Sequence, residues 1–319
     1  MKLVVLERNS VGTDVDVSCF ERFGEVEYYP NTVAENTAER VKDADIIIAN
    51  KAPMNENTLK DAPNVKLICL FATGFDNVDL AYCKSRSIKV ANVVNYSTAA
   101  VVQHTLLLAL ALEEKLVHYD NYVKSGEYGA QDRFSNFDRP FREFEGKTWG
   151  IVGMGNIGRG VAKVAQALGC KVIFYSASGK STCTEYERVE FDTLLGQSDI
   201  LSLHCPLSDR TRGLINKEAF SKMKKSAVLV NVARGPVVDT QALYEALTQG
   251  QIAAAGLDVL EKEPISRDNP LNEIKDSTKL IITPHLAWAS TEARERLVEE
   301  VAKNIQAYLD GEDRNIVNK

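Results

Sequence analysis

A glycine-rich turn between an apolar run and a helix-like segment limits the folds open to this chain more than any other feature. In GIVGMGNIGRG, Gly153, Gly155 and Gly158 stand in GxGxxG order. At this spacing the first glycine permits a tight turn, the second lets the backbone approach a pyrophosphate, and the third allows close packing of helix on strand. The helix that begins with Asn156 and Ile157 then presents N–H groups and a positive dipole end to phosphates. The motif predicts a dinucleotide site, although three glycines can also form an ordinary turn.

Apolar runs alternate with polar helical stretches on both sides of this motif. Such alternation predicts βαβ units and parallel sheets. Six runs from residue 148 onward suit the strands of a complete doubly wound sheet: TWGIVGMG, CKVIFYS, SDILSLHCP, SAVLVNVARG, AAAGLDVL and KLIITPH. Four more, LVVL, DIIIAN, VKLICLFATG and IKVANV, precede residue 94 and lack a GxGxxG turn. We therefore expect two α/β domains, of which the second binds the nucleotide.

Three other segments complete the expected organisation. The run from Thr98 to Lys115 is rich in Ala and Leu and predicts one long buried helix that links the domains. The stretch over residues 120–147 has no clear periodicity and predicts a loop-rich excursion. Near the C-terminus, a segment with apolar residues at i, i+4 spacing predicts an amphipathic helix that packs back on the first domain. Its cap is expected at Ser290 or Thr291, and its apolar residues are Leu297, Val301, Ile305 and Leu309.

Composition and charge argue against several classes of protein. The 319 residues are 45% hydrophobic and 26% charged, which is typical of a two-domain globular chain. A net charge of −6 gives no electrostatic reason to expect nucleic acid or an anionic membrane as partner. The first apolar run is too short for a secretory signal, which predicts a cytoplasmic location. The six cysteines form no CxxC pair and the four histidines do not pair with them at zinc-finger spacing, so we expect free thiols and no metal.

Three candidate catalytic side chains follow predicted strands of the second domain. They are Arg234 in NVARGP, Glu263 in EKEP and His285 in ITPHLAWAS. Hydride transfer to a 2-oxo acid needs a cation for the substrate carboxylate, an acid for the carbonyl oxygen and a carboxylate that keeps that acid charged. A lone histidine after a strand is more often structural, but the glutamate and the arginine at other strand ends favour catalysis.

The position that reads the adenosine ribose leaves the choice of cofactor open. About 20 residues after the glycine turn, NAD-preferring sheets carry an acidic residue, whereas this chain has Ser176 followed by Lys180. Without the carboxylate, repulsion of a 2′-phosphate is lost, and Lys180 could supply a cation for it. The alternative is that both residues are ordinary polar residues of a turn. NAD and NADP both remain candidates.

Several motifs in a fixed order connect the chain to one family. It closely resembles the D-isomer-specific 2-hydroxyacid dehydrogenases through FATGFDNVD, GIVGMGNIGRG, HCPLSDRTRGLIN, NVARGPVVD, GLDVLEKEP and TPHLAWAS. Within that family, YSTAAVVQHT and the WAS after His285 look most like glycerate dehydrogenases, also called hydroxypyruvate reductases. The resemblance implies hydride exchange between NADH or NADPH and C2 of a small 2-oxo acid, with hydroxypyruvate or glyoxylate reduced to D-glycerate or glycolate.

The resemblance also implies roles for individual residues. His285 would be the acid–base group, Glu263 its support and Arg234 a substrate-binding residue. The cofactor cleft would include Asp258, near the nicotinamide amide, together with Cys205, Pro206 and Ala233. Backbone amides of the turn at Thr73 and Gly74 would receive the substrate carboxylate. Asn50 and Lys51 would border the same pocket, unless they are only a helix cap and a solvated lysine.

The family architecture implies an α/β protein of two doubly wound parallel-sheet domains. A Rossmann cofactor domain, residues 99–288, would be inserted in a smaller flavodoxin-like substrate domain, residues 1–98 plus 289–319. The long helix from Ala99 and the loop after it resemble the family's dimer contact, so a homodimer is expected.

Other functions remain open on the same residues. An NAD-sensing, non-catalytic interaction protein could share this fold, and a D-lactate-type dehydrogenase would use the same residues on another 2-oxo acid. A formate dehydrogenase is disfavoured, because that family has glutamine where this chain has Glu263.

Overall fold

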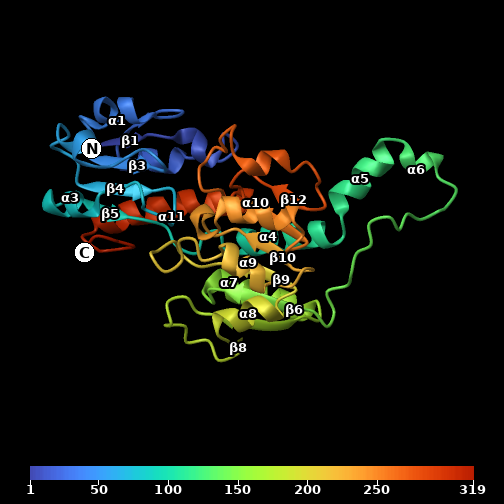
Figure 1. Cartoon of the computed structure of the whole chain (residues 1–319). Helices are drawn as coiled ribbons and strands as arrows, with labels where there is room; N and C mark the ends of the chain where they lie inside the picture. The colour runs from blue at the N-terminus through green and yellow to red at the C-terminus, as the bar shows by residue number, and fades with distance from the viewer. The chain divides into compact units, whose positions relative to one another are not determined.

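The computed structural model describes residues 1–319, which divide into two units (Figure 1). Unit 1 consists of Met1–Ser97 and Trp288–Lys319, and unit 2 consists of Thr98–Ala287. Unit 2 thus interrupts unit 1 along the chain. Both units are built on a parallel sheet with helices packed against it, so the predicted fold class is confirmed.

Unit 1 has a five-stranded parallel sheet in the order β2-β1-β3-β4-β5, which is the flavodoxin-like order. The central strands are apolar on both faces and fully buried, as expected where helices cover both sides of a sheet. The predicted runs missed one edge strand, because its sequence EVEY is half polar. The strands are β1 (Lys2–Val5), β2 (Glu25–Tyr28), β3 (Ile46–Ala49), β4 (Leu67–Leu70) and β5 (Lys89–Ala91).

The C-terminal helix α11 (Thr291–Leu309) packs against β4, as predicted, and Ser290 is its N-cap. Leu297, Val301 and Ile305 are fully buried along this face. The prediction was wrong for Leu309, which is exposed because it is the last residue of the helix. The other helices of unit 1 are short: η1 (Arg8–Val11), η2 (Ser18–Phe23), α1 (Ala34–Val41), α2 (Glu56–Leu59) and α3 (Leu80–Ser85).

Unit 2 has a seven-stranded parallel sheet in the order β12-β11-β10-β9-β6-β7-β8. The order reverses between β6 and β9, as in a Rossmann sheet, and ligands bind at such a switch point. All six predicted strands are present, with a two-residue edge strand added. They are β6 (Thr148–Val152), β7 (Lys171–Tyr175), β8 (Glu187–Arg188), β9 (Ile200–Leu203), β10 (Val228–Asn231), β11 (Ala254–Leu257) and β12 (Leu280–Ile282).

The predicted long helix is α4 (Thr98–Glu113), which packs on β10, β11 and β12. The glycine turn opens α7 (Asn156–Ala167). The remaining helices in the body of unit 2 are α8 (Phe191–Gln197), α9 (Lys217–Lys222), η3 (Gly235–Val237), α10 (Thr240–Thr248) and η4 (Pro270–Glu273).

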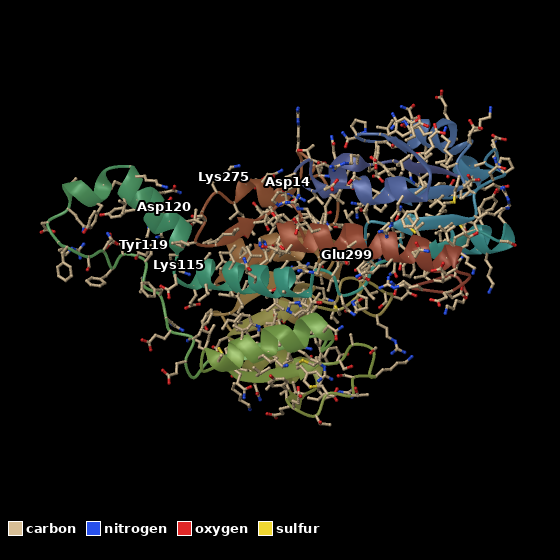
Figure 2. All side chains as sticks on the ribbon, turned by 180° about the vertical axis from the view of Figure 1, so that it is seen from behind. Asp14, Lys115, Tyr119, Asp120, Lys275 and Glu299 are labelled. Atoms are coloured by element: carbon tan, nitrogen blue, oxygen red, sulfur yellow. The ribbon has the colours of Figure 1, made fainter.

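The excursion after α4 is more helical than predicted. It begins with α5 (Leu116–Lys124) and α6 (Glu127–Ala130), and neither helix has a buried residue. Figure 2 shows Tyr119 and Asp120 on α5, which stands apart from the sheet of unit 2 together with α6. Helices without a buried face carry no apolar periodicity, so the sequence pattern could not reveal them. Three exposed phenylalanines follow: Phe134, Phe137 and Phe141.

Candidate active site

The glycine turn of unit 2 has the conformation that a dinucleotide site requires. Gly153 has φ +94°, and a Cβ atom there would lie 2.7 Å from the carbonyl oxygen of His204. A Cβ atom on Gly158 would lie 2.2 Å from the carbonyl oxygen of Gly153, so this glycine allows α7 to pack on the turn. A Cβ atom on Gly155 would meet nothing within 4 Å, and no side chain caps α7. Open backbone at a helix N-terminus fits the pyrophosphate of a nicotinamide cofactor.

The residues that follow β9 lie beside this turn. β6 pairs with β9 so that Val152 stands opposite Leu203, and the His204 N–H donates to the Val152 carbonyl over 2.8 Å. Cys205 is buried and Pro206 is exposed. Burial raises the pKa of the Cys205 thiol to about 11. Cys205 therefore lines the switch point as a small apolar residue and not as a nucleophile.

The ribose position lies in a tight turn after β7. Ser176 is buried, its carbonyl accepts from the Gly179 N–H, and its Oγ accepts from the Ser181 N–H over 3.3 Å. Lys180 is exposed and has no ion pair. Ser176 thus occupies the position at which NAD-preferring sheets carry an acidic residue, and the side chain of Lys180 is exposed to solvent in the same turn.

His285 and Glu263 form a close pair. Nδ1 of His285 lies 2.6 Å from Oε2 of Glu263, and both side chains are about one-third exposed. The other oxygen, Oε1, accepts from the Leu260 N–H over 2.9 Å, which fixes the carboxylate relative to its own loop. A carboxylate on Nδ1 fixes the orientation of the ring and leaves Nε2 as the nitrogen that can exchange a proton with a substrate.

Arg234 lies on a loop that touches the Glu263 loop. A Cβ atom on Gly235 would lie 1.9 Å from the carbonyl carbon of Leu260, so glycine is needed where the two loops cross. Asn231, at the end of β10, holds the Arg234 turn, because its amide donates to the Arg234 carbonyl and its oxygen accepts from the Ala233 N–H, each over 3.0 Å. Arg234 itself is half-buried and donates to the Ala233 carbonyl over 2.8 Å. The structure therefore brings Arg234, Glu263 and His285 to one edge of the sheet.

Asp258 follows β11 and is nearly fully buried. Its Oδ1 accepts from the Leu286 N–H over 2.9 Å and its Oδ2 accepts from the Ala287 N–H over 2.8 Å. Its carbonyl oxygen accepts from the His285 N–H over 2.8 Å. Asp258 thus holds the backbone of the histidine and of the two residues that follow it, whereas the sequence predicted only a position near the nicotinamide amide.

The predicted substrate residues of unit 1 follow β3 and β4. Asn50 is buried and Lys51 is exposed without an ion pair. Their backbone N–H groups donate to the carboxylate of Glu7, which sequence reasoning missed. Asn50 is no helix cap, since α2 is capped by Asn55. In the turn after β4, the Thr73 hydroxyl donates to the Val93 carbonyl over 2.7 Å, and Gly74 follows.

Comparisons with known proteins decide the family. The sequence model for "D-isomer specific 2-hydroxyacid dehydrogenase, NAD binding domain" matches residues 106–287. A hydroxypyruvate reductase of Blautia hydrogenotrophica is 40% identical over 100% of both chains. A glycerate dehydrogenase of Methylorubrum extorquens is 40% identical over 99% of this chain and 98% of its own. The chain belongs to the D-isomer-specific 2-hydroxyacid dehydrogenases.

A solved structure agrees with this assignment. D-lactate dehydrogenase from Aquifex aeolicus, complexed with NAD and lactic acid, superposes with a TM-score of 0.86 at 31% identity, covering 100% of this chain and 99% of its own. As a D-isomer-specific 2-hydroxyacid dehydrogenase, the chain is an oxidoreductase that uses a nicotinamide cofactor, which confirms the predicted class of enzyme and cofactor. None of its helices is long and apolar enough to cross a membrane.

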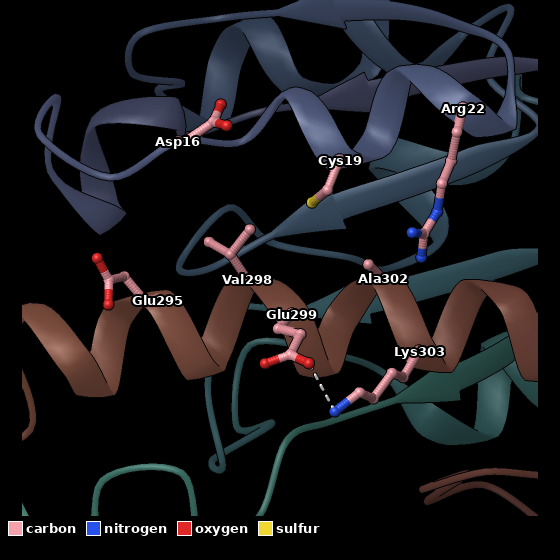
Figure 3. A pocket seen from close by; sticks show the side chains of 8 residues that line it. All are labelled: Asp16, Cys19, Arg22, Glu295, Val298, Glu299, Ala302 and Lys303. Atoms are coloured by element: carbon pink, nitrogen blue, oxygen red, sulfur yellow. Dashed lines mark ion pairs between the residues drawn. The ribbon is translucent and has the colours of Figure 1, made fainter.

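One pocket of this dehydrogenase lies away from the strand ends. It has a volume of about 350 Å³ and lies in unit 1 between η2 and α11, where Cys19, Val298 and Ala302 form an apolar wall (Figure 3). Its charged rim includes Lys303, which pairs with Glu299 over 2.9 Å. The pocket is lined by no histidine and by none of the predicted site residues.

Sequence reasoning missed several polar residues that hold the site of this dehydrogenase together. Asn231 and Thr283 each follow an apolar run directly, and that signal could have identified them. Glu7 follows β1 in the same way. His104 contacts Thr283 from inside the apolar α4 and gives no such signal.

Proposed function

We propose that this dehydrogenase reduces a small 2-oxo acid at C2, with hydroxypyruvate and glyoxylate as its principal substrates. The observation that carries the proposal is the 2.6 Å contact between His285 and Glu263, at the sheet edge that also bears Arg234. Two full-length relatives at 40% identity, a hydroxypyruvate reductase and a glycerate dehydrogenase, support this substrate class.

In the proposed mechanism the nicotinamide cofactor, when bound, supplies the hydride. The Arg234 guanidinium binds the substrate carboxylate, because its planar fork can make two parallel hydrogen bonds. Protonated His285 donates its Nε2 proton to the carbonyl oxygen at C2 as that oxygen gains charge. Glu263 accepts a hydrogen bond from Nδ1, which keeps Nε2 as the nitrogen that transfers the proton. In the oxidative direction neutral His285 accepts the proton of the 2-hydroxyl group.

Unit 2 is proposed as the cofactor domain and unit 1 as the substrate domain. The residues assigned to the cofactor surround the glycine turn and the carboxyl ends of the neighbouring strands: Gly153, Gly155, Asn156, Ile157, Gly158, Ser176, Cys205, Pro206, Ala233 and Asp258. In unit 1 the Thr73–Gly74 turn is assigned to the substrate carboxylate, with Asn50 and Lys51 as further substrate contacts.

The protein is proposed to be a cytoplasmic homodimer. The segment after α6 exposes three phenylalanines, of which Phe134 is 90% exposed. An exposed apolar patch of this kind favours a second copy of the chain as its partner. All six cysteines are free thiols, which suits a reducing compartment.

A substrate panel tests the proposed function. Purified protein is assayed with hydroxypyruvate, glyoxylate, pyruvate and a branched 2-oxo acid, each with NADH and with NADPH. The highest kcat/KM is expected for hydroxypyruvate or glyoxylate. A preference for pyruvate would instead support a D-lactate-type enzyme, in line with the Aquifex relative. Cofactor binding without turnover of any substrate would support a non-catalytic, NAD-sensing protein.

A further inference from the structure

The backbone of His285 has an unusual conformation that its neighbours must maintain. Its φ of +55° lies in the left-handed region, which is costly for a residue other than glycine. The N–H groups of His285, Leu286 and Ala287 donate hydrogen bonds to oxygens of Asp258, and these bonds hold this conformation. The direction of the imidazole therefore depends on the position of the Asp258 carboxylate.

Thr283 fixes that carboxylate from a neighbouring strand end. Its Oγ1 lies 2.6 Å from Oδ1 of Asp258. Since a carboxylate oxygen of this kind accepts, the threonine hydroxyl is the donor on this contact. The hydroxyl oxygen is then left to accept a hydrogen bond from elsewhere.

His104 supplies that hydrogen bond from α4. Its Nε2 lies 2.9 Å from Thr283 Oγ1 and 3.5 Å from Oδ1 of Asp258. The Thr283 hydroxyl already donates its hydrogen to Asp258, so its oxygen can only accept from His104. The hydrogen of this contact is therefore on Nε2 of His104. Burial lowers the pKa of His104, while the Asp258 carboxylate acts in the opposite direction, so the ring is neutral at neutral pH. The neutral ring with hydrogen on Nε2 is the form that the contact requires.

We propose that His104 is a positioning residue for His285: it donates to Thr283, which orients the Asp258 carboxylate that holds the histidine loop. His104 touches neither substrate nor reacting atoms in this arrangement. It acts from the helix that precedes the α5–α6 excursion, through two intermediate side chains. The inference rests on the proposed catalytic role of His285 and identifies what maintains its geometry.

The kinetic test replaces each polar side chain with an apolar one of similar shape and then restores the hydrogen-bonding group. His104→Phe and Thr283→Val should each lower kcat by about 10- to 100-fold, the scale expected when a catalytic group is misplaced by a fraction of an ångström to an ångström. KM for the 2-oxo acid and Kd for NADH, measured by fluorescence titration, should stay within about twofold. His104→Gln and Thr283→Ser keep a donor and a hydroxyl, so they should return kcat to within about threefold of the parent value.

A matched control separates this effect from damage to the helix. Thr105 is the buried neighbour on α4 whose hydroxyl bonds only to the Val101 carbonyl of the same helix. Thr105→Ala should lower the melting temperature without lowering kcat. A His104→Phe variant with parental kcat, or a His104→Gln variant as impaired as His104→Phe, would overturn the inference. An inactive parent would instead overturn the proposed function.

A second measurement needs no activity. The chain has four histidines, so ring-¹⁵N-labelled protein gives few signals and single variants can assign them. At pH 7.5 the His104 ring should be neutral with its hydrogen on Nε2, and Thr283→Val should perturb the signals of both His104 and His285. A charged His104, or one with its hydrogen on Nδ1, would contradict the arrangement whatever the enzyme turns over.

Discussion

His285 and Glu263 are joined by a 2.6 Å contact between Nδ1 and Oε2, while the second oxygen of the carboxylate is tied to its own loop at Leu260. The glutamate therefore has one fixed orientation, in which it faces the imidazole. Replacing His285 with alanine should lower kcat by about 10² to 10⁴, the usual scale for removal of a general acid. Kd for NADH, measured by fluorescence, should change little. Near-parental turnover would exclude His285 as the proton donor.

Glu263→Gln should lower kcat without abolishing activity. The amide oxygen can still accept from Nδ1 and orient the ring, but it is a weaker acceptor than a carboxylate, so the ring is held less firmly. We expect kcat for 2-oxo acid reduction to fall about 5- to 10-fold while Kd for NADH stays unchanged. A parental kcat would exclude Glu263 from this role.

Arg234→Lys should chiefly impair substrate use. An ammonium group cannot reproduce the two parallel hydrogen bonds of a guanidinium to a carboxylate. We expect kcat/KM for the best 2-oxo acid to fall at least tenfold while NADH still binds. Because the Arg234 turn is held by Asn231 and packed at Gly235, the variant should keep the parental melting temperature. An unchanged kcat/KM would mean that Arg234 contributes only to packing and does not bind the substrate carboxylate.

Ser176→Asp should discriminate against NADPH. The new carboxylate would accept from the ribose hydroxyls of NADH and repel a 2′-phosphate. The ratio of kcat/KM with NADH to kcat/KM with NADPH should therefore rise by about 10- to 100-fold. The parent should use NADPH at least comparably with NADH. Ser178→Asp is the matched control, since it adds the same charge at an exposed position two residues away. Strong rejection of NADPH by the parent, or an equal effect of the control, would contradict the role of Ser176.

His204 should make the folded protein sensitive to acid. Burial lowers its pKa to about 3, so between that pH and about 6.5 the unfolded chain binds a proton here and the folded chain does not. Stability due to this group is therefore complete above about pH 6.5 and declines as the pH falls, by up to about 1.4 kcal/mol per pH unit. Urea unfolding at pH 7.5, 6 and 5 measures the slope, which should be shallower in His204→Gln. Parallel slopes for parent and variant would contradict this account.

Much of the fold was predictable because strands buried on both faces leave continuous apolar runs. The polar edge strand β2 and the two-residue β8 leave none, and both were missed. The helix α5 was missed for a related reason, since none of its residues is buried. Apolar patterning reports burial, and elements without burial escape it.

The candidate site likewise contains residues that the sequence pattern could reveal and contacts that it could not. Arg234, Glu263 and His285 were recognisable because each is a polar residue in the loop that follows an apolar run of the sequence. The contact between His104 and Thr283 was not, because it joins a residue inside an apolar helix to one 179 positions later. Such a contact depends on how α4 packs on the sheet, and helical periodicity does not determine that.

The interruption of unit 1 by unit 2 has a consequence for synthesis on the ribosome. The last residues of the chain return to β5, where the Val317 N–H donates to the Val90 carbonyl over 2.9 Å and Ile316 pairs with Ala91. Domains generally fold as units while the chain emerges. Unit 2 has all of its residues by Ala287, whereas the sheet of unit 1, begun at Lys2, lacks α11 until the chain is nearly complete. The unit that starts first is therefore the one that can finish only last.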